Sequence, residues 1–295
     1  MQRFIVDPEH NNYLVGDYLT EIHNYSRRGL RNAEVYLNGK KIRLDKKMKN
    51  LKKPNQILVV EKKKETGIRP IKMDLEIAYE DKNLLVLNKP PYIIVHPTQK
   101  KVDMTLANGV VDYFQQIGMG NDIPRFYNRL DMNTSGLIVI AKNAFTQSFL
   151  QESGEVRKMY QAIVLGVMPK DEYIIEKPIG RVGEELRRVE LPISEGGQSA
   201  KTVIRVLKRF EKENLTLVEA ELFTGRTHQI RAHLSLEGFP ILGDELYGGA
   251  DKRAKRQLLH AYRLVFNNPE NKNREKKEKI EIVIDIPQDM KEILG

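Results

Sequence analysis

One acidic residue, Asp131, lies in a stretch whose composition suggests chemistry. The segment 126–143 reads FYNRLDMNTSGLIVIAKN, so Asp131 follows a basic residue and precedes a turn of small polar residues and an apolar run. A carboxylate removed from water stays ionised only if a cation or hydrogen-bond donors compensate its charge. An isolated Asp in a loop is most often a turn or cap residue. Here the donor-rich turn and the strand that follows favour a catalytic carboxylate.

A second cluster, FTGRTHQIRAHL, combines two arginines and two histidines around the start of an expected helix. The helix is expected to begin just before His228, which would place Arg231 almost one turn after it. His228 and His233 are five residues apart, so they do not share a helix face as the i, i+4 pair of a zinc helix does. The spacing disfavours a metal site and indicates that Arg226 and Arg231 bind a phosphate or a carboxylate. An ordinary basic helix is the alternative.

Two further segments carry one candidate side chain each. LNKPPYIIVHP at 87–97 predicts a strand, a rigid turn and a second apolar strand that ends near His96, which we interpret as a structural histidine. RKMYQAIVLG at 157–166 predicts a strand that Tyr160 opens. A tyrosine in that position more often packs than reacts, so neither segment alone indicates a function.

The elements that would position these side chains form two parts. In the first, apolar residues three and four apart predict a helix at 15–22, and Ser26 is placed to cap a second one. VYLNGKKI predicts a hairpin, because Asn38-Gly39 tolerates the positive φ of a tight turn, and 57–60 predicts another strand. We expect a small α/β module here.

The stretch EKKKETGIRP has no apolar periodicity, so we expect a module at 1–62, a linker at 63–70 and a larger domain at 71–295. Apolar segments of the larger domain predict strands at 84–87, 137–140, 162–165, 203–207, 215–222 and 280–284, helices at about 104–117, 144–153 and 228–236, and a hairpin loop at 267–279. Strands outnumber helices and their spacing is too irregular for βαβ repeats. The pattern therefore predicts a mixed, largely antiparallel α+β fold.

The positive charge of the chain is concentrated in its first quarter. Residues 1–70 contain 16 Lys or Arg against 8 Asp or Glu, whereas the remainder contains 33 against 32. A basic module on a near-neutral body suggests a polyanionic partner such as RNA, although lysine-rich surfaces also serve solubility.

The 295-residue chain contains no cysteine, which excludes disulfides, thiolate metal sites and a cysteine nucleophile. No apolar stretch approaches the roughly 18 to 20 residues that span a bilayer, and the start lacks the pattern of a signal peptide. We therefore expect a cytoplasmic protein without membrane contact, and a monomer by default.

Taken together and in this order, these motifs resemble one family, the RluA-type RNA pseudouridine synthases. The resemblance runs from about residue 75 to 285 and is carried by NKPPYIIVHP, NRLDMNTSGLIVIAKN, KMYQAIVLG, GRTHQIRAHLSLEGFPILGDELYGG and LLHAYRL. Residues 14–60 are similar to the RNA-binding module of ribosomal protein S4, in Ser26-Arg27, VYLNGK and KPNQILVV. That module often precedes this type of catalytic domain.

The resemblance implies an enzyme that converts uridine in RNA to pseudouridine without a cofactor. It implies that Asp131 is the catalytic carboxylate, that Tyr160 stacks on the uracil and that Arg231 pairs with Asp131. The expected RNA contacts, in the catalytic domain and the module, are Arg129, Arg226, His228, Ser26, Arg27, Arg28 and Lys40. Ribosomal RNA of the large subunit is the expected substrate, and transfer RNA is the alternative.

One position departs from the family pattern. The residue before Arg-Leu-Asp is usually His and is Asn128 here, which can donate a hydrogen bond but cannot carry charge. This substitution leaves open a non-catalytic RNA-binding or ribosome-assembly protein with the same fold. A glycoside hydrolase would need a second carboxylate about 5 to 9 Å from Asp131, for which only Glu237 or Asp244 could be imagined.

Overall fold

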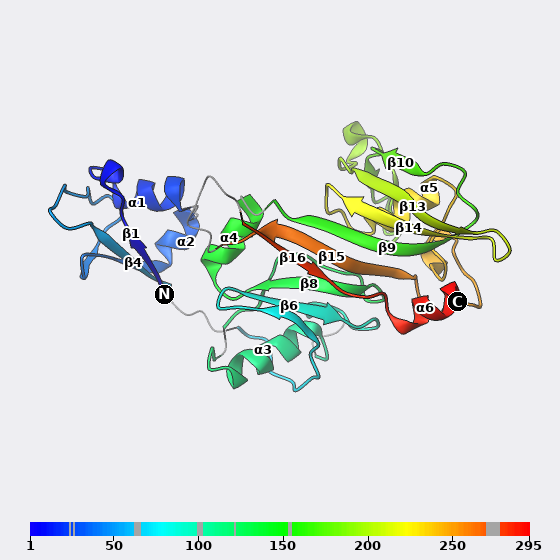
Figure 1. Cartoon of the computed structure of the whole chain (residues 1–295), viewed down its shortest axis with the longest axis horizontal. Coiled ribbons are helices and arrows are strands. Elements are labelled where there is room, and N and C mark those ends of the chain that lie inside the picture. The colour runs from blue at the N-terminus through cyan, green and yellow to red at the C-terminus, as the bar shows by residue number, and fades with distance from the viewer. Residues whose placement is uncertain are drawn as a thin grey trace.

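The structure, a computed structural model, describes residues 1–23, 25, 27–61, 66–98, 103–120, 122–152, 155–269 and 278–295. Two parts are visible, a small sheet with its helical turns at the N-terminal end and a long, larger sheet flanked by helices (Figure 1). None of the helices in these ranges combines the length and the hydropathy needed to cross a bilayer.

The small part is an antiparallel four-stranded sheet packed against short helices. Its strands are β1 (Gln2–Ile5), β2 (Ala33–Leu37), β3 (Lys40–Ile42) and β4 (Gln56–Glu61), in the order β1-β4-β2-β3. Its helical segments are η1 (Pro8–His10), α1 (Val15–Asp17), the π-helical turn η2 (Tyr18–Ile22) and α2 (Arg27–Arg31). The predicted hairpin is confirmed, since Asn38 and Gly39 adopt φ values of 50° and 81° between β2 and β3. Ser26, the expected cap, lies outside the described residues.

The large sheet consists mainly of antiparallel strands. They are β5 (Ile77–Glu80), β6 (Leu84–Lys89), β7 (Arg125–Phe126), β8 (Ser135–Ala141), β9 (Arg157–Leu165), β10 (Glu172–Ile175), β13 (Thr202–Phe210), β14 (Leu215–Leu222), β15 (Leu259–Asn267) and β16 (Lys279–Val283). The order is β10-β13-β14-β9-β15-β8-β6-β5, with β16 beside β15 and β7 beside β8. Only the short β15–β8 pairing is parallel among the described strand pairs, so the predicted mixed, largely antiparallel fold is confirmed.

Helices cover this sheet. Three lie at the predicted places, α3 (Leu106–Gln116), α4 (Ala144–Glu152) and α5 (Gln229–Leu236), whereas α6 (Gln288–Leu294) and the short turns η3 (Ile193–Glu195) and η4 (Glu245–Tyr247) were not predicted. Leu85 and Leu87 of β6 pack with α3, whereas Leu84 and Val86 pack on the opposite face with Leu150 of α4. The continuous apolar runs therefore arise from strands buried on both faces.

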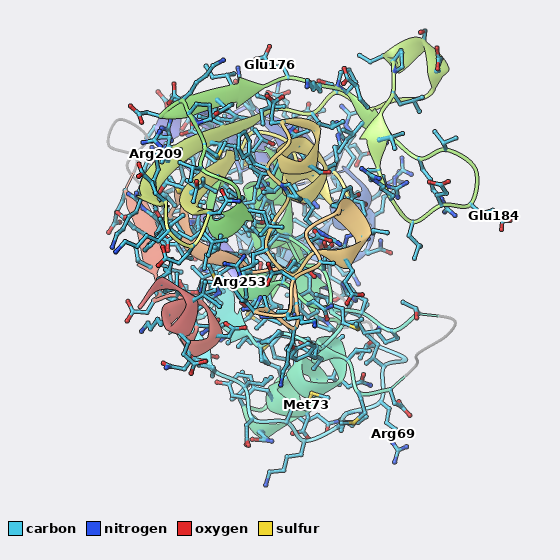
Figure 2. All side chains as sticks on the ribbon, turned by 90° about the vertical axis from the view of Figure 1, so that its right-hand side faces the viewer. Arg69, Met73, Glu176, Glu184, Arg209 and Arg253 are labelled. Carbon is cyan, nitrogen blue, oxygen red and sulfur yellow. The ribbon has the colours of Figure 1, made fainter. Side chains whose placement is uncertain are left out.

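A small hairpin extends from the body of the large part. It is formed by β11 (Ile179–Gly180) and β12 (Val189–Glu190), and Figure 2 shows Glu184 on the loop that joins them, well away from the sheet. Its backbone is anchored at both ends: the Ile179 amide donates a hydrogen bond to the Gln198 carbonyl at 3.0 Å, and the Arg188 amide donates one to the Tyr247 hydroxyl at 2.7 Å.

The predicted second strand within 87–97 is wrong. After β6 the chain turns at Tyr92, whose φ is 67°, and the residues that follow do not enter the sheet. Instead the carbonyl groups of Ile94 and Val95 accept hydrogen bonds, both 2.9 Å long, from the amides of Leu106 and Ala107. These amides belong to the first turn of α3 and have no partner within the helix. The segment satisfies a helix N-terminus, a role that apolar periodicity does not reveal.

Helix α4 links the small part to the large sheet. The Phe145 ring lies 5.2 Å from that of Tyr25, centroid to centroid, and packs against the core of the small part. The Gln2 side chain donates a hydrogen bond to the side chain of Asn83 at 3.4 Å. Removal of the small part would therefore expose an aromatic surface on α4.

Four strands align at one row of the large sheet. Ala220 of β14 lies opposite Tyr160 of β9, Tyr160 lies opposite Ala261 of β15, and Ala261 pairs with Gly136 of β8. Gly136 has φ of 113°, and a Cβ atom there would lie 2.3 Å from the Ala261 carbonyl oxygen. Only glycine allows β8 to approach β15 this closely.

We predict that Gly136→Ala lowers the free energy of unfolding by about 2 kcal/mol or more, because it adds both a backbone clash and φ strain. Urea denaturation of the wild type and the variant measures the difference. Gly67→Ala is the matched control, since a Cβ there meets no atom within 4 Å. Equal stability of both variants and the wild type would show that β8 can shift away from β15.

Candidate active site

Asp131 lies in the turn that connects β7 with β8. The Thr134 amide donates a hydrogen bond to the Asp131 carbonyl at 3.1 Å and closes the turn. The side chain is 29% exposed, so its carboxylate reaches the surface of a cavity rather than bulk solvent or the core.

Two buried basic side chains, Lys89 and Arg256, donate hydrogen bonds to the main-chain carbonyl groups of this turn. Lys89 is fully buried, and its ammonium group donates hydrogen bonds to the carbonyls of Pro90, Ile93 and Met132 at 2.8, 3.1 and 3.0 Å. Burial and the nearby charge of Arg256 lower the pKa of Lys89 to about 7, and the charge of Asp131 opposes that shift.

Arg256 is the second cation beneath the turn. Its guanidinium donates to the Asn133 carbonyl at 3.1 Å and binds both carboxylate oxygens of Asp289 in α6, at 2.6 and 2.9 Å. Next to it, Ser135 and His260 share a hydrogen bond of 2.9 Å. The backbone that carries Asp131 is therefore fixed by contacts from β6, from the start of β15 and, through Asp289, from α6.

Arg231 of α5 lies between two carboxylates. One edge of its guanidinium makes two hydrogen bonds with Asp244, of 2.6 and 2.8 Å, and the remaining nitrogen, Nη1, donates to Asp131 at 2.8 Å. Burial would lower the pKa of Arg231, but the hydrogen bonds and charge of Asp244, and then Asp131, raise it above its ordinary value. A permanently charged donor thus faces the Asp131 carboxylate.

The start of α5 differs from the prediction. The helix begins at Gln229, and His228 before it is left-handed, with φ of 57°. In the loop before it, the Gln229 side-chain oxygen accepts hydrogen bonds from the Thr224 hydroxyl and from the Arg226 amide, which close a tight turn. His228 consequently points to Asp131, with its Nε2 atom 3.7 Å from the carboxylate.

His228 and Tyr247 form a second layer around the carboxylate. The His228 Nδ1 atom lies 3.2 Å from the Tyr247 hydroxyl, and the Tyr247 ring packs 5.0 Å from the Arg231 guanidinium. Burial lowers the pKa of His228, and the charge of Asp131 opposes this shift. By contrast His233 is bonded within the core to Thr202 and to the Lys177 carbonyl, which is a structural role.

Tyr160 lies in the wall of the cavity beside Asp131. It is 5% exposed, and burial, followed by the charge of Asp131, raises the pKa of its phenol. The side chains opposite it on both neighbouring strands, Ala220 and Ala261, are small. The ring lies between these small neighbours and contributes to the lining of the cavity.

The cavity has a volume of about 690 Å³, within the range of small-molecule and nucleotide sites. It brings together the predicted catalytic and RNA-contact residues of the large part, Asp131, Tyr160, Arg231, Arg129, Arg226 and His228. Arg27 and Lys40 lie on the surface of the small part. Ser26 and the side chain of Arg28 lie outside the described residues.

Asn128 has a defined structural role. Its side-chain nitrogen donates to the Leu137 carbonyl at 3.2 Å, and its side-chain oxygen accepts from the Val139 amide at 2.8 Å. The amide group thus pairs with β8 as a short piece of strand would. This contact fixes the residues that lead into Asp131 without any charge.

Neither carboxylate considered for a glycosidase is available as a second acid. Asp244 is buried in its pair with Arg231, and Glu237 pairs with Lys177 at 2.9 Å. In the described ranges no group of three or more His, Asp or Glu side chains is arranged to hold a metal ion.

Sequence reasoning missed Lys89, Arg256 and the pairing role of Asp244. Lys89 and Asp244 both stand in segments that carry the family resemblance, which was the available signal. The Met132 carbonyl is 43 residues from Lys89 and Arg231 is 13 residues from Asp244, so no local pattern identifies these two contacts.

We predict that Asp244→Asn lowers the free energy of unfolding by about 2 to 4 kcal/mol, because it leaves the buried Arg231 with one compensating carboxylate. Asp251→Asn is the control, since its pair with Arg253 is partly exposed and worth about 1 kcal/mol or less. Thermal and urea unfolding at pH 7 measure both. Similar small losses for the two variants would contradict the importance of the buried pair.

The sequence matches the RNA pseudouridylate synthase family over residues 83–236, more than half of the chain. It is 36% identical over 223 residues to the uncharacterized RNA pseudouridine synthase YjbO of Bacillus subtilis, an alignment that covers 75% of each chain. It is 37% identical over 216 residues to the ribosomal large subunit pseudouridine synthase D of Pseudomonas aeruginosa, covering 67% of this chain and 65% of that protein.

The fold agrees with these matches. The structure of human RNA pseudouridylate synthase domain containing 1 superposes with a TM-score of 0.56 and 26% identity, over 72% of this chain and 83% of that one. The family match, the relatives aligned over two thirds or more of the chain and the shared fold agree. This chain therefore belongs to the RluA-type RNA pseudouridine synthases and is an isomerase that acts on RNA.

Proposed function

We propose that this enzyme isomerises uridines in large-subunit ribosomal RNA, with Asp131 as its catalytic carboxylate. The observation that carries the proposal is the 2.8 Å contact of Asp131 with the buried Arg231 in the wall of the cavity. The target class is supported by the names of relatives such as the ribosomal large subunit pseudouridine synthases D of Pseudomonas aeruginosa and Yersinia pestis.

The chemistry asks little of the protein beyond positioning and charge. The bond between uracil N1 and the anomeric carbon breaks, a bond from C5 to that carbon forms, and the hydrogen lost from C5 is balanced by one gained at N1. The balance needs no oxidant, reductant or group donor. An ionised carboxylate serves each route by which Asp131 could act, on the anomeric carbon, on the uracil ring or on a sugar proton.

Arg231 stabilises that carboxylate once RNA displaces water from the cavity, because the attraction between the two charges strengthens as the local dielectric falls. Tyr160 offers its ring to the uracil, in the space left by its small cross-strand neighbours. The uridine must leave its stack to reach this depth, which favours loop uridines as substrates. Arg129 and Arg226, both exposed at the cavity, bind the RNA backbone.

Residues 1–62 form an S4-like RNA-binding module in this proposal, joined to the catalytic domain at 71–295 by a linker at 63–70. Arg27 and Lys40 are exposed on it and bind phosphates, contributing affinity rather than choice of base. The enzyme works as a monomer and without a cofactor.

We predict that Asp131→Asn abolishes product formation, with a loss of about a thousandfold or more, since the neutral amide cannot replace the carboxylate. The assay incubates the full chain with ribosomal and transfer RNA transcripts and maps pseudouridine at single-nucleotide resolution. Asp251→Asn controls for removal of a carboxylate outside the cavity.

Each other outcome has a defined meaning. If Asp131→Asn formed as much product as the wild type, Asp131 would not be the catalytic carboxylate. If pseudouridine appeared only in transfer RNA, transfer RNA would be the substrate in place of ribosomal RNA. RNA binding by the wild type without any isomerised uridine would favour the ribosome-assembly function instead.

We predict that Arg27→Gln combined with Lys40→Gln weakens RNA binding and reduces the slope of log affinity against log salt by about 1.4 to 1.8, for two lost phosphate contacts. Full-length protein is used, because deletion of the module would also uncover Phe145. Lys252→Gln combined with Lys255→Gln makes the same charge change outside the module. If both double variants lowered the slope equally, the module would have no special role in binding.

A further inference from the structure

Lys158 is a cationic side chain in the wall of the cavity. It lies on β9 two residues before Tyr160, so the two side chains share one face of the strand. Its cross-strand neighbours are Leu264 on β15 and Leu222 on β14, and Leu222 also lines the cavity. Its ammonium group lies 5.9 Å from the centre of the Tyr127 ring. Within the described part of the chain it makes neither a hydrogen bond nor an ion pair.

Three other cations around the site have partners, whereas Arg129, which is exposed, makes no hydrogen bond or ion pair with the described residues. Arg231 has two carboxylates, Lys89 has three carbonyl oxygens, and the Arg226 Nε atom donates to the Ser199 carbonyl at 3.0 Å. The neighbouring residue in the sequence, Arg157, differs from Lys158 in having a carboxylate partner. Arg157 points to the opposite face of β9 and pairs with Glu221 at 2.8 Å.

Lys158 is half-buried in the cavity wall, and burial lowers the pKa of its ammonium group, with no carboxylate to oppose the shift. An anionic ligand in the cavity would supply the acceptor and the negative charge that this side chain lacks in the free protein.

The charge balance of the cavity indicates the same ligand. Among the described residues, its lining contains four cationic side chains, Arg129, Lys158, Arg226 and Arg231, and a single carboxylate, Asp131. Arg231 already compensates Asp131, so the cavity has an excess of positive charge. In RNA the formal negative charge is on the phosphates.

The spacing along β9 fits a nucleotide. Residues i and i+2 of a strand are about 6.6 to 6.8 Å apart, and a base is separated from its own phosphate by one sugar, a distance of the same order. A uracil against the Tyr160 ring would place its backbone near Lys158.

We propose that Lys158 binds a phosphate next to the target uridine and so holds the flipped nucleotide in the cavity. This inference rests on the proposed function of the site and names a group of the substrate that the site recognises. Because the contact is made before and during the reaction, it contributes to binding more than to the chemical step.

The test is a cycle that combines protein variants with modified RNA. The RNA is a short oligonucleotide from the ribosomal RNA fragment that the full-length enzyme modifies or, failing product, binds most tightly. An uncharged methylphosphonate replaces each phosphate in turn. Binding is read by fluorescence anisotropy and turnover by pseudouridine formation, for the wild type, Lys158→Met, Lys158→Arg and the control Arg157→Met.

For wild type and Arg157→Met, we expect one methylphosphonate position to weaken binding roughly ten- to a hundredfold, as loss of a charged hydrogen bond does. In Lys158→Met that position should have less than about a twofold effect, with KM raised and kcat changed little. Lys158→Arg should restore most of the affinity. Lys158→Met should unfold no more easily than wild type, because the lost group has no partner in the free protein.

The proposal would be overturned if, at every phosphate position, the loss of affinity from the methylphosphonate and the loss from Lys158→Met simply multiplied. So would a fall in kcat at unchanged KM that arginine does not rescue, since the amine would then act on the base. If the wild type formed no product, only the proposed function would be refuted. The binding measurements of the cycle would still test the contact between Lys158 and a phosphate.

Discussion

The site depends on one buried guanidinium, that of Arg231, whose hydrogen-bond donors are shared between two carboxylates. Asp244 occupies one edge with two hydrogen bonds and is itself 1% exposed, so the plane of the guanidinium is fixed. What remains is a single nitrogen aimed at Asp131. A lysine could supply the charge but not this division, because an ammonium group has no planar fork. The orientation of the carboxylate is thus set by a residue a hundred positions later in the chain.

Main chain and side chain of Asp131 are controlled by different contacts. Lys89 and Arg256 bind the carbonyls of Met132 and Asn133, which fixes the backbone, and Arg231 binds the carboxylate. Such a separation allows a side chain to be preorganised before substrate arrives, since no rotamer or loop has to be ordered at that moment. It also places buried cations beneath the carboxylate, where their charge acts without being accessible to RNA.

The fold was largely predictable from the sequence because its strands are long and apolar. LLVL and LIVI are continuous runs since both faces of β6 and β8 are covered, and the Asn38-Gly39 turn has few alternatives. The error at 92–95 has the opposite origin, because an apolar run there serves the N-terminus of α3 rather than the sheet. The left-handed conformation of His228 was not predicted either, since the side-chain hydrogen bonds of Gln229 that close its loop cannot be seen in a sequence pattern. Candidate residues could be named from motifs, but the buried partners Asp244, Lys89 and Arg256 become meaningful only through contacts distant in sequence.

Arg256 has a consequence for the timing of assembly. Its guanidinium reaches the Asp131 turn on one side and Asp289 of α6 on the other. A nascent chain released as far as Arg231 has every residue that touches the carboxylate side chain, yet it lacks the cation beneath the turn and the helix that compensates that cation. Because contacts of such long sequence separation form late, the turn reaches its final geometry only after residue 289 has left the ribosome. The site of this RNA-modifying enzyme is therefore completed by a cation that is synthesised 123 positions after the turn residue that it binds.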